Sequence, residues 1–189
     1  MKIFEYLILF FSFAFTLALT HLLFAMTRMI RHRRELVFSI EHALWMANAL
    51  FLLLANWLSL FDYRGKESFD LGSIAVLMVF VITLYFACAL VSPDFEDDEQ
   101  YDMRAFHRRE GRTYIGALAM LIVVSFIANI DASREGVAVW GQENIVVMWM
   151  IPVTFAPLIW RNRAVQLISP LALMALTITF TIIYYPVIN

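Results

Sequence analysis

Residues 171–185 read LALMALTITFTIIYY, a continuously apolar run of the kind that decides the fold of this chain. A strand of a membrane barrel would alternate apolar and polar residues, and this run does not alternate. A helix of about 20 apolar residues can cross the hydrocarbon core of a bilayer, which is about 30 Å thick. The run therefore predicts a transmembrane helix over 164–185.

Five further stretches have the same apolar character. The six stretches together contain a single formal charge, Glu41, although the chain carries 14 basic and 16 acidic residues. Charged residues make up 16% of the chain, whereas soluble domains have about 25%. We predict an all-α polytopic membrane protein, with one domain formed by a bundle of six transmembrane helices. The expected spans are 6–27, 37–60, 71–92, 113–130, 144–160 and 164–185.

The composition also narrows the possible classes of function. A net charge of −2 leaves no extended basic surface for nucleic acid, so no nucleic-acid partner is expected. The one cysteine, Cys88, cannot form an intramolecular disulfide. Phosphate-binding loops, HExxH, CxxC and serine-nucleophile motifs are absent, which favours a protein that is not an enzyme. A calcium loop from Asp94 fails, because Glu99 and Ala105 stand where glycine and a bidentate glutamate are needed.

The distribution of basic residues predicts the orientation in the membrane. Segments 28–36, 93–112 and 161–163 contain four, four and two arginines, and the remaining connections and the amino-terminal end hold four basic residues. The positive-inside rule places the arginine-rich loops in the cytoplasm, so both termini lie on the non-cytoplasmic side. We expect the first span to be retained, because it is long and ends in arginines rather than at a small-residue cleavage site. A bacterial inner (cell) membrane is the expected location, since no organelle signal is visible.

A polar group of residues is expected between the first two spans. His21 lies six residues before the end of the first span and His42 five residues after the start of the second. At about 1.5 Å per residue, both lie roughly 8–9 Å below the inner interface. Glu41 adjoins His42, and helices joined by a short turn are usually neighbours. The sequence therefore predicts that His21, Glu41 and His42 meet inside the bundle.

A carboxylate and two imidazoles in a membrane interior suit a proton relay or a metal ion with nitrogen and oxygen ligands. The structural alternative is that Glu41 caps its helix or pairs with Arg34, while the histidines hydrogen-bond to nearby backbone. Haem held by His21 and His42 would need ligands from two helices joined by a short turn, which is an awkward geometry. No cofactor is assigned.

The second span carries a polar stripe that extends this group. Asn48 and Asn56 lie near the same helical face as Glu41. Facing the hydroxyl side chains of the first span, the stripe would line a narrow hydrated path. The alternative is that these polar side chains only hold helices together by hydrogen bonds. The facing hydroxyls of the first span are Ser12, Thr16, Thr20 and Thr27.

The segment 93–112 is the longest cytoplasmic piece, a charged loop or an interfacial helix. Acidic residues crowd its start and arginines its end, a distribution that a helix dipole favours. We expect its arginines to contact anionic lipid or a protein partner, the alternative being a solvated charged loop. His107 is interpreted as an exposed residue. The arginines are Arg104, Arg108, Arg109 and Arg112.

The first functional hypothesis is a small ion or proton pathway or transporter that uses His21, Glu41, His42, Asn48 and Asn56. At 189 residues, such a protein is expected to form a homo-oligomer or to join a membrane-protein partner. The second hypothesis is an accessory, sensory or scaffolding membrane protein that acts through its charged loop. A membrane-bound redox or metal-binding protein is the third.

Overall fold

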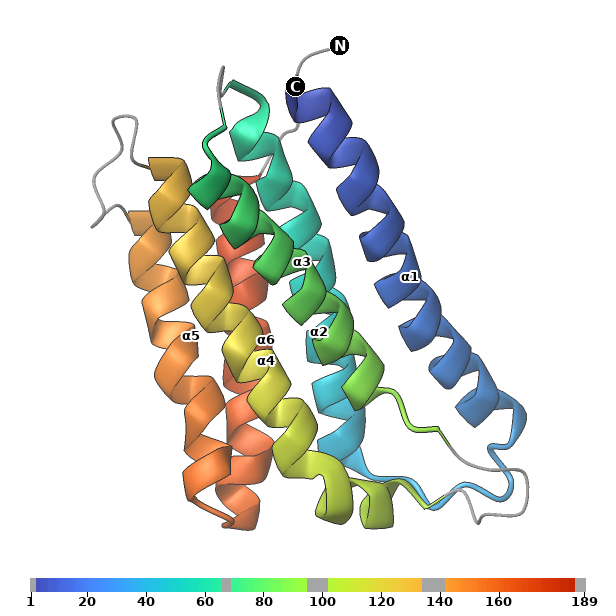
Figure 1. Ribbon diagram of the computed structural model, residues 1–189. Coiled ribbons are helices and arrows are strands. Elements are labelled where there is room, and N and C mark those ends of the chain that lie inside the picture. The colour runs from blue at the N-terminus through green and yellow to red at the C-terminus, as the bar shows by residue number, and fades with distance from the viewer. Residues whose placement is uncertain (1–2, 66–68, 95–101, 134–141, 186–189) are drawn as a thin grey trace.

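A computed structural model describes residues 3–65, 69–94, 102–133 and 142–185 of the chain. The described residues form six α-helices and one 3-10 helix, η1, with no strand, so the all-α prediction is confirmed. Figure 1 shows the helices running up and down alternately in one bundle. Their bounds are α1 Ile3–Arg31, α2 Ile40–Ser59, η1 Leu60–Gly65, α3 Leu71–Val91, α4 Met103–Ser133, α5 Gln142–Ile159 and α6 Arg163–Tyr184.

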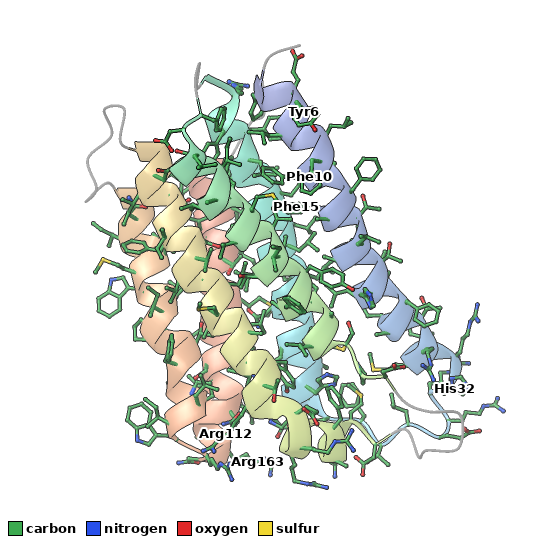
Figure 2. The ribbon with its side chains drawn as sticks, in the orientation of Figure 1. Tyr6, Phe10, Phe15, His32, Arg112 and Arg163 are labelled. Atoms are coloured by element: carbon green, nitrogen blue, oxygen red, sulfur yellow. The ribbon has the colours of Figure 1, made fainter. Side chains whose placement is uncertain are left out.

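The surface and the helix lengths are compatible with an integral membrane protein. Five of the described helices are long and apolar enough to cross a bilayer, and the apolar part of α5, Asn144–Ile159, is shorter. Large apolar side chains such as Phe13, Trp149 and Ile182 are exposed on the outside of the bundle. Figure 2 shows Tyr6 and Phe10 on α1 near one end of the bundle. A lipid environment accommodates such side chains, whereas extensive apolar patches are unusual on soluble monomers.

The neighbours of α1 differ from the expectation. α1 packs chiefly along α3 and touches α2 only slightly, whereas α2 packs mainly on α6. α4 joins the two halves, because it packs on both α3 and α5. Figure 1 shows α1 at the edge of the bundle, with its last turns well away from the rest. α1 nevertheless contributes buried side chains such as Phe15, Ala18 and Leu22 to the core that it shares with the other helices.

Local sequence explains where several helices begin. Ser39 is the N-cap of α2, and its hydroxyl accepts a hydrogen bond from the His42 amide (3.4 Å). Asp102 starts α4, since its carboxylate accepts from the amides of Arg104 (2.8 Å) and Ala105 (2.9 Å). Side chains of this kind satisfy the free amides at a helix start. Asn162 caps α6 in the same way.

The start of α4 is a second difference from the expectation. Residues 103–112, expected in a charged loop or a separate interfacial helix, form the first turns of α4. A short bridge between Val37 and Asp102 anchors this start, and the Met103 amide donates to the Val37 carbonyl (3.0 Å). The acidic residues 96–99 lie outside the described part of the chain. Charged residues thus form the first turns of the long helix α4 instead of a separate segment.

All ten arginines of segments 28–36, 93–112 and 161–163 lie where α1, α3 and α5 end and α2, α4 and α6 begin. We call this the arginine-rich end; Figure 1 shows it at the bottom, with the start of α1 and the end of α6 at the opposite end.

Candidate anion site at the arginine-rich end

His42 is the most buried polar residue at this end. Its side chain is 0% exposed, and its Nε2 lies 2.9 Å from the carbonyl oxygen of Val91, at the end of α3. A carbonyl can only accept, so Nε2 carries the hydrogen. The ring also contacts Phe106 and Tyr114 of α4, with centroids 5.0 and 5.7 Å away. His42 therefore holds three helices together, and its Nδ1 has no hydrogen-bond partner among the described residues.

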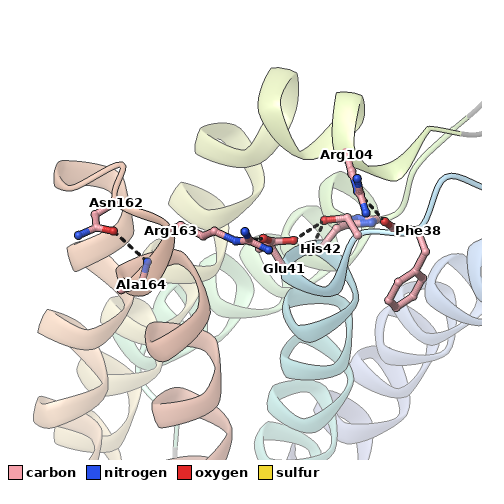
Figure 3. A network of polar contacts seen from close by, with 8 residues as sticks. Phe38, Glu41, His42, Arg104, Asn162, Arg163 and Ala164 are labelled. Carbon is pink, nitrogen blue, oxygen red and sulfur yellow. Dashed lines mark hydrogen bonds and ion pairs between the residues drawn. The ribbon is translucent and has the colours of Figure 1, made fainter.

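Glu41, beside His42, points toward a different neighbour. Its carboxylate accepts a hydrogen bond from the Ser39 hydroxyl (2.9 Å) and lies 3.8 Å from Nε of Arg163, the first residue of α6. Figure 3 shows this contact bridging the starts of α2 and α6. The first turn of a helix favours a carboxylate, because the free amides there carry partial positive charge. The Glu41 side chain is 19% exposed and that of Arg163 is 84% exposed, so the pair is mostly a surface ion pair.

A cavity of about 510 Å³ opens beside Glu41, between α2, α4, α5 and α6. We call it the arginine pocket. Four arginines and one carboxylate line it, so its wall carries an excess of positive charge. Figure 2 shows two of these arginines, Arg112 and Arg163, close to each other at the same end of the bundle. The lining residues are Glu41, His107, Arg108, Gly111, Arg112, Ile115, Pro157, Arg161, Arg163 and Gln166.

Two contacts shape the wall of the arginine pocket. His107 is half-buried, and its Nδ1 is hydrogen-bonded to the Tyr114 hydroxyl, two turns further along α4. Gln166 of α6 donates to the carbonyl of Pro157 (2.8 Å), near the end of α5 where carbonyls lack helical partners. One hydrogen bond thus fixes a side chain of the α4 wall, and the other joins the α5 and α6 walls.

The arginines of the pocket have the chemistry that suits an anion. Within the described part of the chain, Arg108, Arg112 and Arg161 make no ion pair. A guanidinium presents several N–H donors in a planar fork that matches carboxylate and phosphate oxygens. The pocket can therefore bind a small anion through several arginines at once, and a cation would be repelled.

The four arginines expected to contact lipid or a partner have separate roles. Nε of Arg104 donates to the Phe38 carbonyl (3.0 Å), which fastens α4 to the segment before α2 (Figure 3). Arg109 lies 3.1 Å from its neighbour Glu110. Arg108 and Arg112 line the arginine pocket. Only two of the four thus contribute to one site.

The other expected site residues are divided between different helices. His21 is on α1, and its Nε2 is hydrogen-bonded to the Tyr85 hydroxyl of α3 (3.1 Å). His42 contacts α3 and α4 instead, and Glu41 contacts α6. The structure therefore brings Glu41 and His42 to the arginine-rich end and gives His21 another partner. Of the hydroxyls expected to face α2, those of Ser12, Thr16 and Thr20 donate to carbonyls of α1 itself.

Asn48 and Asn56 face the interior between α2, α4 and α6. The Asn48 amide donates to the carbonyls of Leu44 (2.9 Å) and of Pro170 in α6 (2.8 Å), and the residue is 0% exposed. Asn56 accepts from the Ser125 hydroxyl of α4 (3.0 Å). Both contacts are hydrogen bonds between helices, as the alternative interpretation expected.

A second, smaller cavity lies further along the same helices. Its volume is about 30 Å³, and Asn56, Ser125, Asn129 and Thr177 contribute polar groups to its wall. A polar cavity larger than about 15 Å³ can hold a water molecule. Ile115 of the arginine pocket and Ile122 of the smaller cavity lie seven positions apart on α4, which corresponds to about 10 Å.

The core between the two cavities is closed. Its fully buried side chains include Asn48, Leu118, Thr154 and Leu173. Among the described residues, no group of three His, Cys, Asp or Glu side chains is arranged to hold a metal ion.

Sequence reasoning missed several residues of the arginine pocket. His107, interpreted as exposed, lines the wall, and Arg161, Arg163 and Gln166 come from the α5–α6 connection and the start of α6. The heptad spacing of His107 and Tyr114 was a usable signal, because it places both on one helical face once α4 is extended to Met103. Nothing in the local sequence indicates that Glu41 would face Arg163.

No protein-family model matches the chain, and the searches of curated proteins and of solved structures likewise returned no match.

Proposed function

We propose that the protein is a six-span transporter of a small anionic solute, with its arginine-rich end in the cytoplasm of a bacterial cell. The observation that carries the proposal is the arginine pocket, whose cavity of about 510 Å³ is lined by four arginines and one carboxylate. The excess positive charge of the pocket wall favours an anion over a proton or a metal cation as the transported ion. Carboxylates and phosphates are the chemical classes that arginine forks bind best.

The pathway runs through α2, α4, α5 and α6, because these four helices line both cavities. The solute enters the arginine pocket, and the smaller cavity marks the other half of the route. The closed core around Asn48 and Leu173 separates the two, which is the arrangement an alternating-access protein needs in one of its states.

Prolines mark the helices that would move. Pro152 and Pro157 lie inside α5 and Pro170 lies inside α6. Each removes one backbone hydrogen bond of its helix and weakens it at that point. Pro170 also accepts the Asn48 hydrogen bond, so opening the core between α2 and α6 requires that this one bond break. A hydrogen bond between membrane helices contributes about 0.6–2 kcal/mol, which a bound solute can offset.

Reconstitution in liposomes tests the proposal. Uptake of radiolabelled phosphate and of a dicarboxylate is measured against uptake of a monovalent cation and of protons. We expect uptake of at least one anion, strongly reduced in Arg112→Gln and Arg163→Gln. Arg109→Gln is the matched control, since Arg109 lies on the same helix and does not line the pocket.

Two results would overturn the transport function. Cation or proton flux without anion flux would show that the charge of the pocket does not select the solute. Anion binding without any flux would favour the accessory or sensory role, with the pocket as a ligand sensor.

A further inference from the structure

A second cavity at the arginine-rich end has the opposite chemistry. It is a groove of about 350 Å³ between α1 and α2, with Met103 of α4 also in its wall. We call it the α1–α2 groove. Among the described residues its wall is almost wholly apolar, and the one charged residue there is Arg33, which follows the end of α1. The groove exists because α1 packs on α3 and leaves α2 partly uncovered.

We propose that the α1–α2 groove binds one anionic phospholipid, with an acyl chain along α2 and the phosphate at Arg33. A ligand that fits must be apolar over most of its length and negatively charged at one end. A phospholipid of the surrounding bilayer has this chemistry. The inference does not depend on transport, because the groove and the arginine pocket share no lining residue.

The dimensions of the groove suit an acyl chain. Its α2 wall extends from Ala43 to Phe51, which is about 12 Å of helix at 1.5 Å per residue. One leaflet contributes about 15 Å to a hydrocarbon core about 30 Å thick. The groove therefore covers most of the depth of one leaflet, starting at the end where lipid phosphates lie.

The side chains of the groove suit a flexible ligand. Four methionines line it: Met26 and Met29 from α1, Met46 from α2 and Met103 from α4. Methionine is unbranched and polarizable, so it adapts to ligands that do not have one fixed shape. Rigid β-branched side chains would select a single conformation instead.

The charge at the mouth of the groove favours an anionic headgroup. Arg33 is exposed, and Arg31 and Arg34 are exposed beside it. Basic residues next to a membrane helix attract anionic lipids, each by about 1 kcal/mol, which corresponds to about fivefold in affinity. A zwitterionic phospholipid offers the same chains without the net negative charge.

Native mass spectrometry of the full chain in detergent tests the proposal. Phosphatidylglycerol and phosphatidylcholine with identical acyl chains are added to the delipidated protein, and inorganic phosphate is added alone in a third arm. We expect one phosphatidylglycerol to be retained in preference to phosphatidylcholine, and no retention of phosphate at this site. Arg33→Gln should weaken phosphatidylglycerol binding about fivefold, whereas Arg64→Gln, at the opposite end, should not.

A variant that fills the groove provides the decisive control. Ala47→Phe places a ring in the α1–α2 groove and should abolish lipid retention, whereas Ala75→Phe, at an exposed position of α3, should not. Met29→Phe tests the same point from α1 if Ala47→Phe does not fold. The proposal would be overturned if the protein retained both phospholipids equally, or if both groove-filling variants still retained phosphatidylglycerol. It would also be overturned if the protein formed a dimer that retained no lipid.

Discussion

Replacement of His42 should reveal how much one buried imidazole contributes to the packing of three helices. The residue is 0% exposed, and its Nε2–H donates to the Val91 carbonyl at 2.9 Å. His42→Phe keeps an aromatic ring beside Phe106 and Tyr114 but leaves that carbonyl without its donor. A buried polar group without a partner costs about 1–3 kcal/mol. The substitution also removes the buried Nδ1, which has no described partner, and this offsets part of the cost. We therefore expect the free energy of unfolding to fall by about 1–2 kcal/mol.

His42→Ala should cost more, because it also removes the ring. The contacts with Phe106 and Tyr114 are worth about 0.5–1.5 kcal/mol each when they are aromatic pairs. The cavity left behind adds to the loss, so we expect about 3–5 kcal/mol in total. The expected order of stability is therefore wild type, then His42→Phe, then His42→Ala.

The assay is reversible unfolding in mixed micelles with increasing denaturing detergent, followed by circular dichroism. Each variant's free energy of unfolding is compared with that of the wild type at the same lipid content. A His42→Phe variant as stable as the wild type would refute the contribution of the Val91 hydrogen bond. Equal losses in the two variants would refute the contribution of the ring contacts.

Three further outcomes are expected. Glu41→Gln should raise the affinity of the arginine pocket for phosphate or a dicarboxylate, because Arg163 loses a competing carboxylate 3.8 Å away. The gain, measured by calorimetry, should be at most about fivefold, since the ion pair is near the surface. An unchanged affinity would contradict the placement of the anion at Arg163. Asp102→Ala should lower the free energy of unfolding by about 1 kcal/mol through loss of the α4 cap, while Asp102→Asn should retain most of the capping contribution. Equal free energies of unfolding for Asp102→Ala and the wild type would argue against a capping role. Gly111→Ala should raise the free energy of unfolding by about 0.5–1 kcal/mol, since alanine favours the helix more than glycine does. The new Cβ would lie 3.4 Å from His107 Nδ1, which leaves room for it. A loss of stability would mean that the His107 side chain does not accommodate the added methyl group.

Much of the helical architecture could be read from apolar runs. α3 and α6 start and end within one residue of the stretches expected at 71–92 and 164–185. α2 starts at Ile40 rather than at 37, because the Ser39 side chain caps it. The start of α4 was missed by ten residues, because charged residues 103–112 gave no apolar signal and the anchor at Val37 is distant in sequence.

The candidate site was less accessible to sequence reasoning. Glu41 and His42 could be singled out because charges and imidazoles are rare in apolar runs. Their partners could not, since Val91, Tyr114 and Arg163 lie between 49 and 122 residues further along the chain. His21 was assigned to the same group only on equal depth, and depth does not distinguish one neighbouring helix from another.

The sequence by itself determined that this chain forms apolar helices compatible with a membrane, and that ten of its twelve arginines gather at one end of them. Segment length and charge are local properties that need no knowledge of neighbours. Only the tertiary structure decided that α1 packs on α3, and that Glu41 pairs with Arg163 in the wall of a pocket lined with arginines. Hydrophobicity does not determine which helices pack together inside a bilayer, because lipid is as apolar as leucine. The contacts of helices there depend on shape and on a few hydrogen bonds, which appear only when the helices are packed.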